Sequence, residues 1–198
     1  YWTFDKIMKI EKDLGVRSAF YFLKEGAKVK LLKPSTWRHY ARKYDFKDSN
    51  VKELIKKLSS NGWEIGLHGS YDSYLDRNKL KEEKELLENV LGDTVKGVRQ
   101  HCLNLKIPET WRIQEEIGFE YDTSLGFRHL EGGIGFRFGT SHPFRPFSNG
   151  NSMRIIEIPL IIMDISLLPD VKSLAVCREI INSVKTFRGV LNVLWHHT

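Results

Sequence analysis

The stretch WEIGLHGSYD, residues 63–72, brings a histidine and a carboxylate close together in the sequence. Its apolar part stops at His68, and Asp72 follows four residues later. In α/β folds, catalytic and binding residues collect where strands end and loops begin. Imidazole and carboxylate groups are both ligands of zinc and of other divalent ions. His68 and Asp72 are therefore candidate metal ligands, although each could instead be structural, the histidine bonded to a loop carbonyl and the aspartate capping a turn.

Two later segments repeat this pattern of an apolar run that stops at polar, chemically capable side chains: GVRQH over residues 97–101 and VLWHH over residues 193–197. The candidates at or just beyond expected strand ends are His68, Arg99, Asp122, Asp164 and His196. Because the ends of parallel strands gather at one edge, we expect these side chains on one rim and infer an enzyme. The structural alternatives are a buried histidine, an ordinary buried ion pair for Arg99 and loop-fixing aspartates.

Helical and extended patterns alternate along the chain. We expect helices over residues 4–14, 51–58, 78–91, 108–117 and 170–187. Shorter apolar runs predict strands over residues 18–23, 63–67, 95–98, 119–122, 155–162 and 190–195. Pro159 would put the fifth strand at an edge or a bulge, and Leu174, Ile181 and Val184 are expected to face inward on the last helix. This order predicts an α/β fold with a mainly parallel sheet.

Length and composition fit one domain over residues 1–198. The chain is 41% hydrophobic and 28% charged, and none of its apolar runs approaches the ~20 residues that a membrane-spanning helix needs. Cys102 and Cys177 lie far apart and form no CxxC motif, which favours a reducing, cytoplasmic setting. The chain starts at Tyr1 and stops at Thr198 directly after a strand-like run, so we expect the native domain to continue beyond both ends. Nothing in the sequence indicates the oligomeric state.

The net charge is +6, and much of it belongs to residues expected on solvated helix faces. Residues 24–44 are less evenly balanced, because lysines and arginines alternate there with Trp37, Tyr40 and Tyr44. Such a stretch could be an ordinary basic loop, could bind an anionic sugar polymer, or could stack on single-stranded nucleic acid. We favour the loop over the sugar and the sugar over nucleic acid.

Four segments resemble the polysaccharide deacetylase family, the metal-dependent carbohydrate esterases that share the NodB homology domain. SAFYF at residues 18–22 is similar to the family's ATFF strand, and EIGLH at residues 64–68 is similar to its EIGxH strand. GVR at residues 97–99 resembles the strand that carries the family's R-x-P-Y motif, and LWH at residues 194–196 resembles its final L-x-H motif. The resemblance covers nearly the whole domain.

The resemblance implies a distorted (β/α)7 barrel that hydrolyses an acetyl group from an N-acetylated sugar or polysaccharide with Zn²⁺ or another divalent ion. By position, His68 would be a metal ligand, and Asp72 stands where the family has its second metal histidine. Arg99 would orient the catalytic aspartate, and His196 would protonate the leaving amine. The backbone N–H near Cys102 would help to hold the oxyanion.

Some positions depart from the family pattern. Thr3-Phe4-Asp5 looks like the family's TFDDG segment but lies too close to Ser18, so we expect that aspartate motif, with the first strand of the barrel, ahead of Tyr1. Candidate substrate contacts are His101, Asp122 and Asp164, although His101 could also ligate a metal. Two alternatives stay open: a barrel that binds a glycan without catalysis, and a hydrolase of another non-peptide C–N bond.

Overall fold

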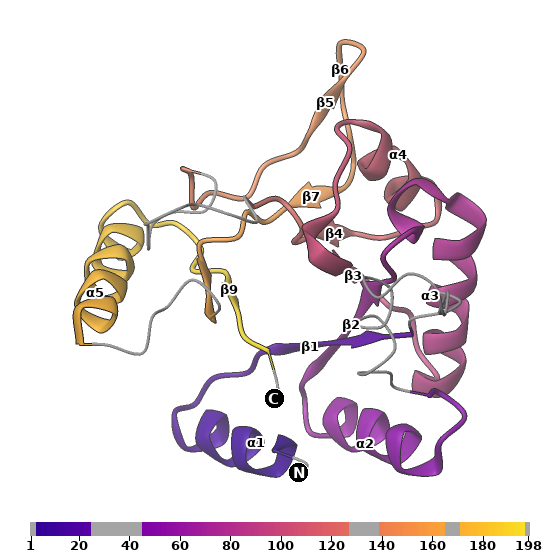
Figure 1. The fold of residues 1–198 in the computed structure, drawn as a ribbon, viewed down its shortest axis with the longest axis horizontal. Helices are drawn as coiled ribbons and strands as arrows, with labels where there is room; N and C mark the ends of the chain where they lie inside the picture. The colour runs from indigo at the N-terminus through magenta and orange to yellow at the C-terminus, as the bar shows by residue number, and fades with distance from the viewer. Residues whose placement is uncertain (1–2, 25–44, 127–138, 165–170, 197–198) are drawn as a thin grey trace, which may run out of the picture.

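A computed structural model describes residues 3–24, 45–126, 139–164 and 171–196, without the side chains of residues 171–173. Figure 1 shows helices and strands alternating along the chain. The helices are α1 (Phe4–Asp13), α2 (Ser49–Ser60), α3 (Arg77–Leu91), α4 (Glu109–Glu116) and α5 (Val171–Thr186), with the short 3-10 turns η2 (Ser73–Leu75) and η3 (His101–Leu103). The strands are β1 (Ala19–Leu23), β2 (Glu64–Gly69), β3 (Gly97–Gln100), β4 (Tyr121–Asp122), β5 (Phe147–Ser148), β6 (Asn151–Ser152), β7 (Ile156–Glu157), β8 (Ile162–Met163) and β9 (Val193–Leu194).

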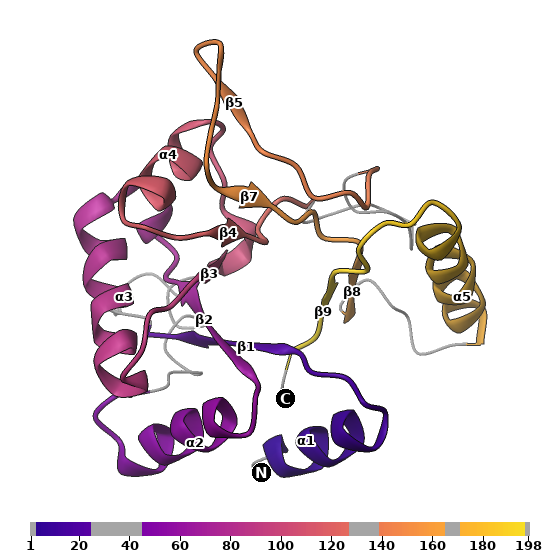
Figure 2. The ribbon, with the colours of Figure 1, turned by 180° about the vertical axis from the view of Figure 1, so that it is seen from behind.

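The strands form a parallel sheet in the order β1-β2-β3-β4-β7 and a separate parallel pair of β8 with β9. The remaining pair, β5 with β6, is an antiparallel hairpin that projects away from the sheet (Figures 1 and 2). The α/β class and the mainly parallel sheet are therefore confirmed. Within the described residues no strand pairing joins β7 to β8 or β9 to β1, so closure into a barrel is not seen. The helices described here include none that is both long and apolar enough to cross a membrane.

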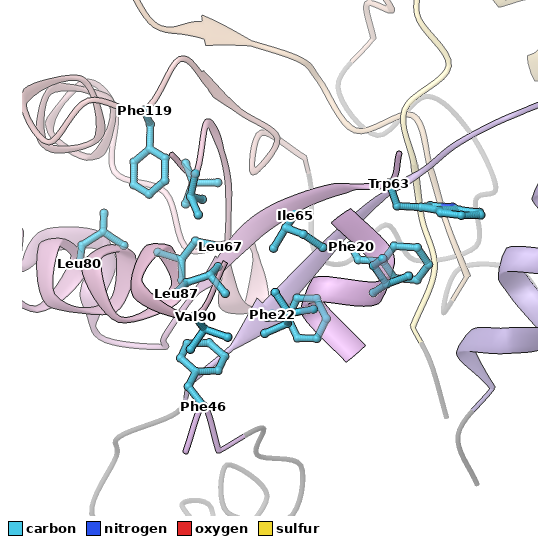
Figure 3. Packing of buried hydrophobic residues seen from close by; sticks show 14 of the residues in the cluster. Phe20, Phe22, Phe46, Trp63, Ile65, Leu67, Leu80, Leu87, Val90 and Phe119 are labelled. Carbon is cyan, nitrogen blue, oxygen red and sulfur yellow. The ribbon is translucent and has the colours of Figure 1, made fainter. Parts of the chain in front are cut away.

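One face of the large sheet forms the main hydrophobic core. Successive side chains of a strand point to opposite faces, so alternate residues of β1 and β2 reach the same layer. These are Phe20, Phe22, Ile65 and Leu67, and they meet buried residues of α2 and α3, as Figure 3 shows for Leu80, Leu87 and Val90. Burial of this apolar face fixes the register, because a shift by one residue would turn it toward the polar side.

The opposite face of the sheet carries two tyrosine side chains, and glycines make room for them. Tyr21 of β1 lies across Gly66 of β2, and Tyr121 of β4 lies across Gly97 of β3. The Tyr21 hydroxyl donates to the Tyr121 hydroxyl at 3.3 Å, and Tyr121 donates to Glu64 Oε1 at 2.6 Å. The two tyrosines thus cover this face of the sheet below the strand ends that hold the candidate site.

We expect Gly97→Ala to destabilise the protein by about 1–3 kcal/mol, because a Cβ at Gly97 would overlap the Tyr121 ring. Chemical denaturation with the linear extrapolation would measure the change. The matched control introduces Gly97→Ala into a Tyr121→Ala background, where most of the penalty should disappear. An equal penalty in both backgrounds would show that the clash with Tyr121 is not its cause.

Two details differ from the sequence predictions. The strand expected over residues 155–162 is wrong: β7 and β8 are separate and belong to different sheets, because Pro159 lies between them and has no N–H to donate to a ladder. On α5, Leu174 and Ile181 are 63% and 41% exposed, whereas Ile180 and Val184 are buried against Ile161 and Ile162. Only Val184 of the three residues expected to face inward does so, since the buried face is rotated around the helix.

Candidate functional site

His68 lies at the end of β2, and its ring is oriented by the neighbouring strand. In the parallel register His68 is opposite Arg99, and His68 Nδ1 lies 2.8 Å from the Arg99 carbonyl oxygen. A carbonyl oxygen can only accept, so Nδ1 carries the proton and, in the neutral ring, Nε2 carries the lone pair. Burial, together with the nearby His101 and Arg99 charges, lowers the pKa of His68 to about 3, so the ring is neutral at physiological pH. This is the form of histidine that binds metals.

His196 and Asp164 form a hydrogen-bonded pair at the ends of β9 and β8. Because these strands are parallel neighbours, the residues that follow them meet at the same edge. Asp164 Oδ1 lies 2.8 Å from His196 Nδ1, and Asp164 Oδ2 accepts the backbone N–H of His196 at 2.7 Å. The carboxylate is mostly buried, whereas the imidazole is 42% exposed. The contact with Asp164 occupies Nδ1, so Nε2 is the ring nitrogen that could transfer a proton.

Arg99 connects the two halves of the site. It is buried on β3, where Nε donates to Thr123 Oγ1 at 2.9 Å and Nη2 donates to Asn192 Oδ1 at 2.9 Å. The guanidinium also lies over the Tyr21 ring, 4.7 Å from its centroid. Burial lowers the pKa of Arg99, but a guanidinium keeps its charge in proteins. Since Asn192 immediately precedes β9, Arg99 holds the β3 end and the His196 segment in one arrangement.

Asp122 and Glu157 form a buried carboxyl pair below this rim. They are opposite each other in the β4–β7 register, and both are fully buried. Ser124 Oγ donates to Asp122 Oδ1 at 2.6 Å, while Glu157 accepts from Trp111 Nε1 at 2.8 Å and from the Leu125 N–H at 3.1 Å. Among the described residues, Asp122 Oδ2 has no donor unless the neighbouring Glu157 carries a proton.

Burial raises the pKa of both carboxyl groups, and the Asp122 charge raises the pKa of Glu157 further. The pair therefore retains a proton at a pH where both groups would be ionised in water. Glu157 was not among the candidate residues selected from the sequence. The available signal was a carboxylate inside the apolar run of residues 155–162, which is costly to bury without a partner.

The two remaining candidates lie in different surroundings. His101 follows β3 directly, and its ring centroid lies 5.3 Å from that of His68. Asp72 is exposed just before η2, and within the described residues its carboxylate has no hydrogen bond or ion pair. The structure thus brings His68, His101 and Arg99 together and leaves Asp72 on the outside of the loop.

Glu83 of α3, also missed from the sequence, anchors that loop. Its buried carboxylate accepts the Ser70 N–H at 3.1 Å and the Ser70 hydroxyl at 2.5 Å, and burial raises its pKa. The Ser73 hydroxyl in turn donates to the Ser70 carbonyl at 2.9 Å. A helix two elements away in the sequence therefore fixes the first residues after His68.

No family model matches the sequence, and no curated protein is significantly similar to it. Among solved structures, the chain is similar to a provisionally assigned polysaccharide deacetylase from Mycobacterium smegmatis, with a TM-score of 0.62 and 20% sequence identity over 96% of this chain and 61% of that one. A second provisionally assigned polysaccharide deacetylase, from Pseudomonas aeruginosa PAO1, aligns with a TM-score of 0.49 and 19% identity over 73% of this chain and 49% of that one.

A mutant CE4 family pseudoenzyme with restored enzymatic activity aligns more loosely, with a TM-score of 0.42 and 11% identity over 96% of this chain and 60% of that one. This chain spans less than two thirds of the length of each of these proteins. On the first of the alignments, the chain has the fold of a polysaccharide deacetylase domain of the NodB type.

Proposed function

We propose that this protein hydrolyses an acetyl group from an N-acetylated sugar or polysaccharide with the help of a divalent metal ion. The observation that carries the proposal is the Asp164–His196 pair, in which the carboxylate holds Nδ1 of a partly exposed imidazole, an arrangement suited to proton transfer through Nε2. The fold supports it, since strand ends of this fold present a catalytic rim. A reducing compartment such as the cytoplasm is part of the proposal, because Cys102 and Cys177 lie far apart in the sequence and form no CxxC motif.

The chemistry of His68 fits a divalent metal ion. Its Nδ1–H is held by the Arg99 carbonyl, so Nε2 offers a lone pair, and this combination is typical of metal-binding histidines. His68 would hold the ion. Imidazole is a ligand that suits Zn²⁺. When bound, such an ion supplies a polarised acetyl carbonyl and a water of lowered pKa.

Proton transfer to the leaving amine falls to His196. Amide hydrolysis adds a hydroxyl group to the acetyl carbon, breaks the C–N bond and must place a proton on the departing nitrogen. His196 in its protonated form can give that proton from Nε2, while Asp164 accepts the Nδ1–H and stabilises the imidazolium. Arg99 keeps both halves of the site in register through Asn192 and the β3 end.

The test is acetate release and metal content, measured together on the full-length protein with N-acetylglucosamine oligomers. We expect a stoichiometric divalent ion and acetate release, with both lost in His68→Ala and little loss of folding, since this ligand lies at a strand end. A His68→Ala variant with full metal content would contradict the assignment of His68. Bound metal without acetate would favour hydrolysis of another C–N bond, and neither metal nor acetate would favour a glycan-binding barrel.

A further inference from the structure

We propose that His101, rather than Asp72, is the second protein ligand beside His68 in the metal site of the proposed function. The inference concerns the same site and rests on that function. It departs from the assignment that the sequence resemblance gives, in which the residue four positions after His68 completes the pair. The departure follows from where the two loops place their side chains.

The register of β2 with β3 aligns the two segments that carry His68 and His101. His68 is opposite Arg99 in the parallel ladder, so the two side chains leave the sheet on the same face. His101 lies two residues beyond Arg99, which returns its side chain to that face. The chain turns immediately afterwards, because Cys102 and Leu103 have φ values of 59° and 54°. His68 and His101 are thus adjacent residues at the ends of neighbouring strands.

The distance between the His68 and His101 rings suits two ligands of one metal ion. Two imidazoles that bind one tetrahedral zinc ion through a ring nitrogen, at about 2.0–2.1 Å, have centroids about 5 Å apart. The centroids of His68 and His101 are 5.3 Å apart, with their planes tilted by 51°. The His101 and Tyr71 rings are nearly perpendicular, with centroids 6.3 Å apart at 89°, and the Asn104 side chain donates to the Tyr71 carbonyl at 2.9 Å. Tyr71 and Asn104 therefore tie the loop after β2 to the loop after β3.

Asp72 does not share the surroundings of the two histidines. Over the part of the chain that is described, no group of three His, Cys, Asp or Glu side chains is close enough to hold a metal ion, so Asp72 does not join His68 and His101. It lies exposed before η2, and the following turn is packed by Ser73, which is fully buried. The other coordination positions would be taken by water or substrate. Two imidazoles favour zinc or cobalt over magnesium.

The test is metal affinity, which does not depend on turnover. The full-length protein is stripped with a chelator and titrated with Zn²⁺ and with Co²⁺, whose visible spectrum reports nitrogen ligands. We expect His68→Ala and His101→Ala each to weaken binding by about 100-fold or more, as loss of one of a few ligands should. Asp72→Ala and the surface control His142→Ala should bind within about threefold of wild type. Excess Mg²⁺ should not displace the ion.

The inference would be overturned if Asp72→Ala lost metal affinity while His101→Ala kept the wild-type affinity. It would also be overturned if both variants bound the metal as the wild type does, or if the wild type bound neither Zn²⁺ nor Co²⁺. Acetate release in the same samples separates this inference from the proposed function. Acetate release with metal binding that does not need His101 leaves the function standing and removes the ligand pair. Metal binding that needs His101, without acetate release, supports the ligand pair and removes the function.

Discussion

Asp164→Asn is expected to lower kcat for acetate release by about 10²–10⁴-fold, with a much smaller change in KM, because general acid catalysis contributes about that much. Asp164 accepts two N–H groups of His196, one from the backbone and one from Nδ1. Asparagine has a single acceptor oxygen, so its amide N–H₂ would face one of these donors. The imidazolium loses its counter-charge in either orientation of the amide, and it also loses its orienting hydrogen bond if the N–H₂ faces Nδ1.

Steady-state kinetics on N-acetylglucosamine oligomers would measure this effect. The matched control is Asp13→Asn, which removes an exposed carboxylate on α1 and should leave kcat unchanged. The double variant Asp164→Asn with His196→Ala should be no slower than His196→Ala alone, because the two residues act as one unit. A raised KM with unchanged kcat in Asp164→Asn would instead make Asp164 a substrate contact, as our sequence analysis predicted for it.

Glu157→Gln is expected to change the dependence of protein stability on pH. The pKa of Glu157 in the folded protein is raised above its ordinary value by burial and by the Asp122 charge. Such a group contributes stability fully below its unfolded pKa, and this contribution is lost as pH rises toward the folded pKa. The pKa of Asp122 is also raised, so the two carboxyl groups act in the same direction.

The free energy of unfolding of the wild type, relative to that of Glu157→Gln, should therefore fall as pH rises above the unfolded pKa of Glu157, by up to about 1.4 kcal/mol per pH unit. At the acidic end of this window the variant should be less stable by about 1–3 kcal/mol, because a single amide oxygen cannot accept from both Trp111 and Leu125.

Denaturation curves at several pH values would test the sign. Glu82→Gln, at an exposed position of α3, is the matched control and should follow the wild type at every pH. If the free energies of unfolding of wild type and Glu157→Gln differ by a constant amount across the pH range, the Asp122–Glu157 pair holds no proton at a pH where both groups would be ionised in water. If the wild type instead becomes more stable relative to Glu157→Gln as pH rises, Glu157 is ionised in the folded state.

Much of the fold could be predicted because its signals are local. Apolar residues at helical spacing predicted α1, α2 and α3 with boundaries near those observed, and the apolar runs before His68 and Arg99 predicted β2 and β3. Two-residue strands were harder to delimit. The run of residues 155–162 read as one strand, but Pro159 interrupts the ladder and the two parts join different sheets.

The candidate site, too, was predictable only in part. Residue types and their places at strand ends were enough to select His68, Arg99 and His196, because a strand end is visible as the last residue of an apolar run. Glu157 was missed because its partner is 35 positions away, as the register of β4 with β7 shows. Asp164 was selected without its role, because that role depends on a hydrogen bond to a residue 32 positions away.

The sequence by itself determined most of the helices and the longer strands, and which side chains stand at their ends, because hydrophobic periodicity acts over a few neighbouring residues. Only the tertiary structure decided which of those side chains meet. The pairing of β8 with β9 brings Asp164 to His196, the β4–β7 register buries Asp122 against Glu157, and the β2–β3 register sets His68 beside His101. Strand order and register arise from packing between segments far apart in the chain, and a local pattern does not contain that information.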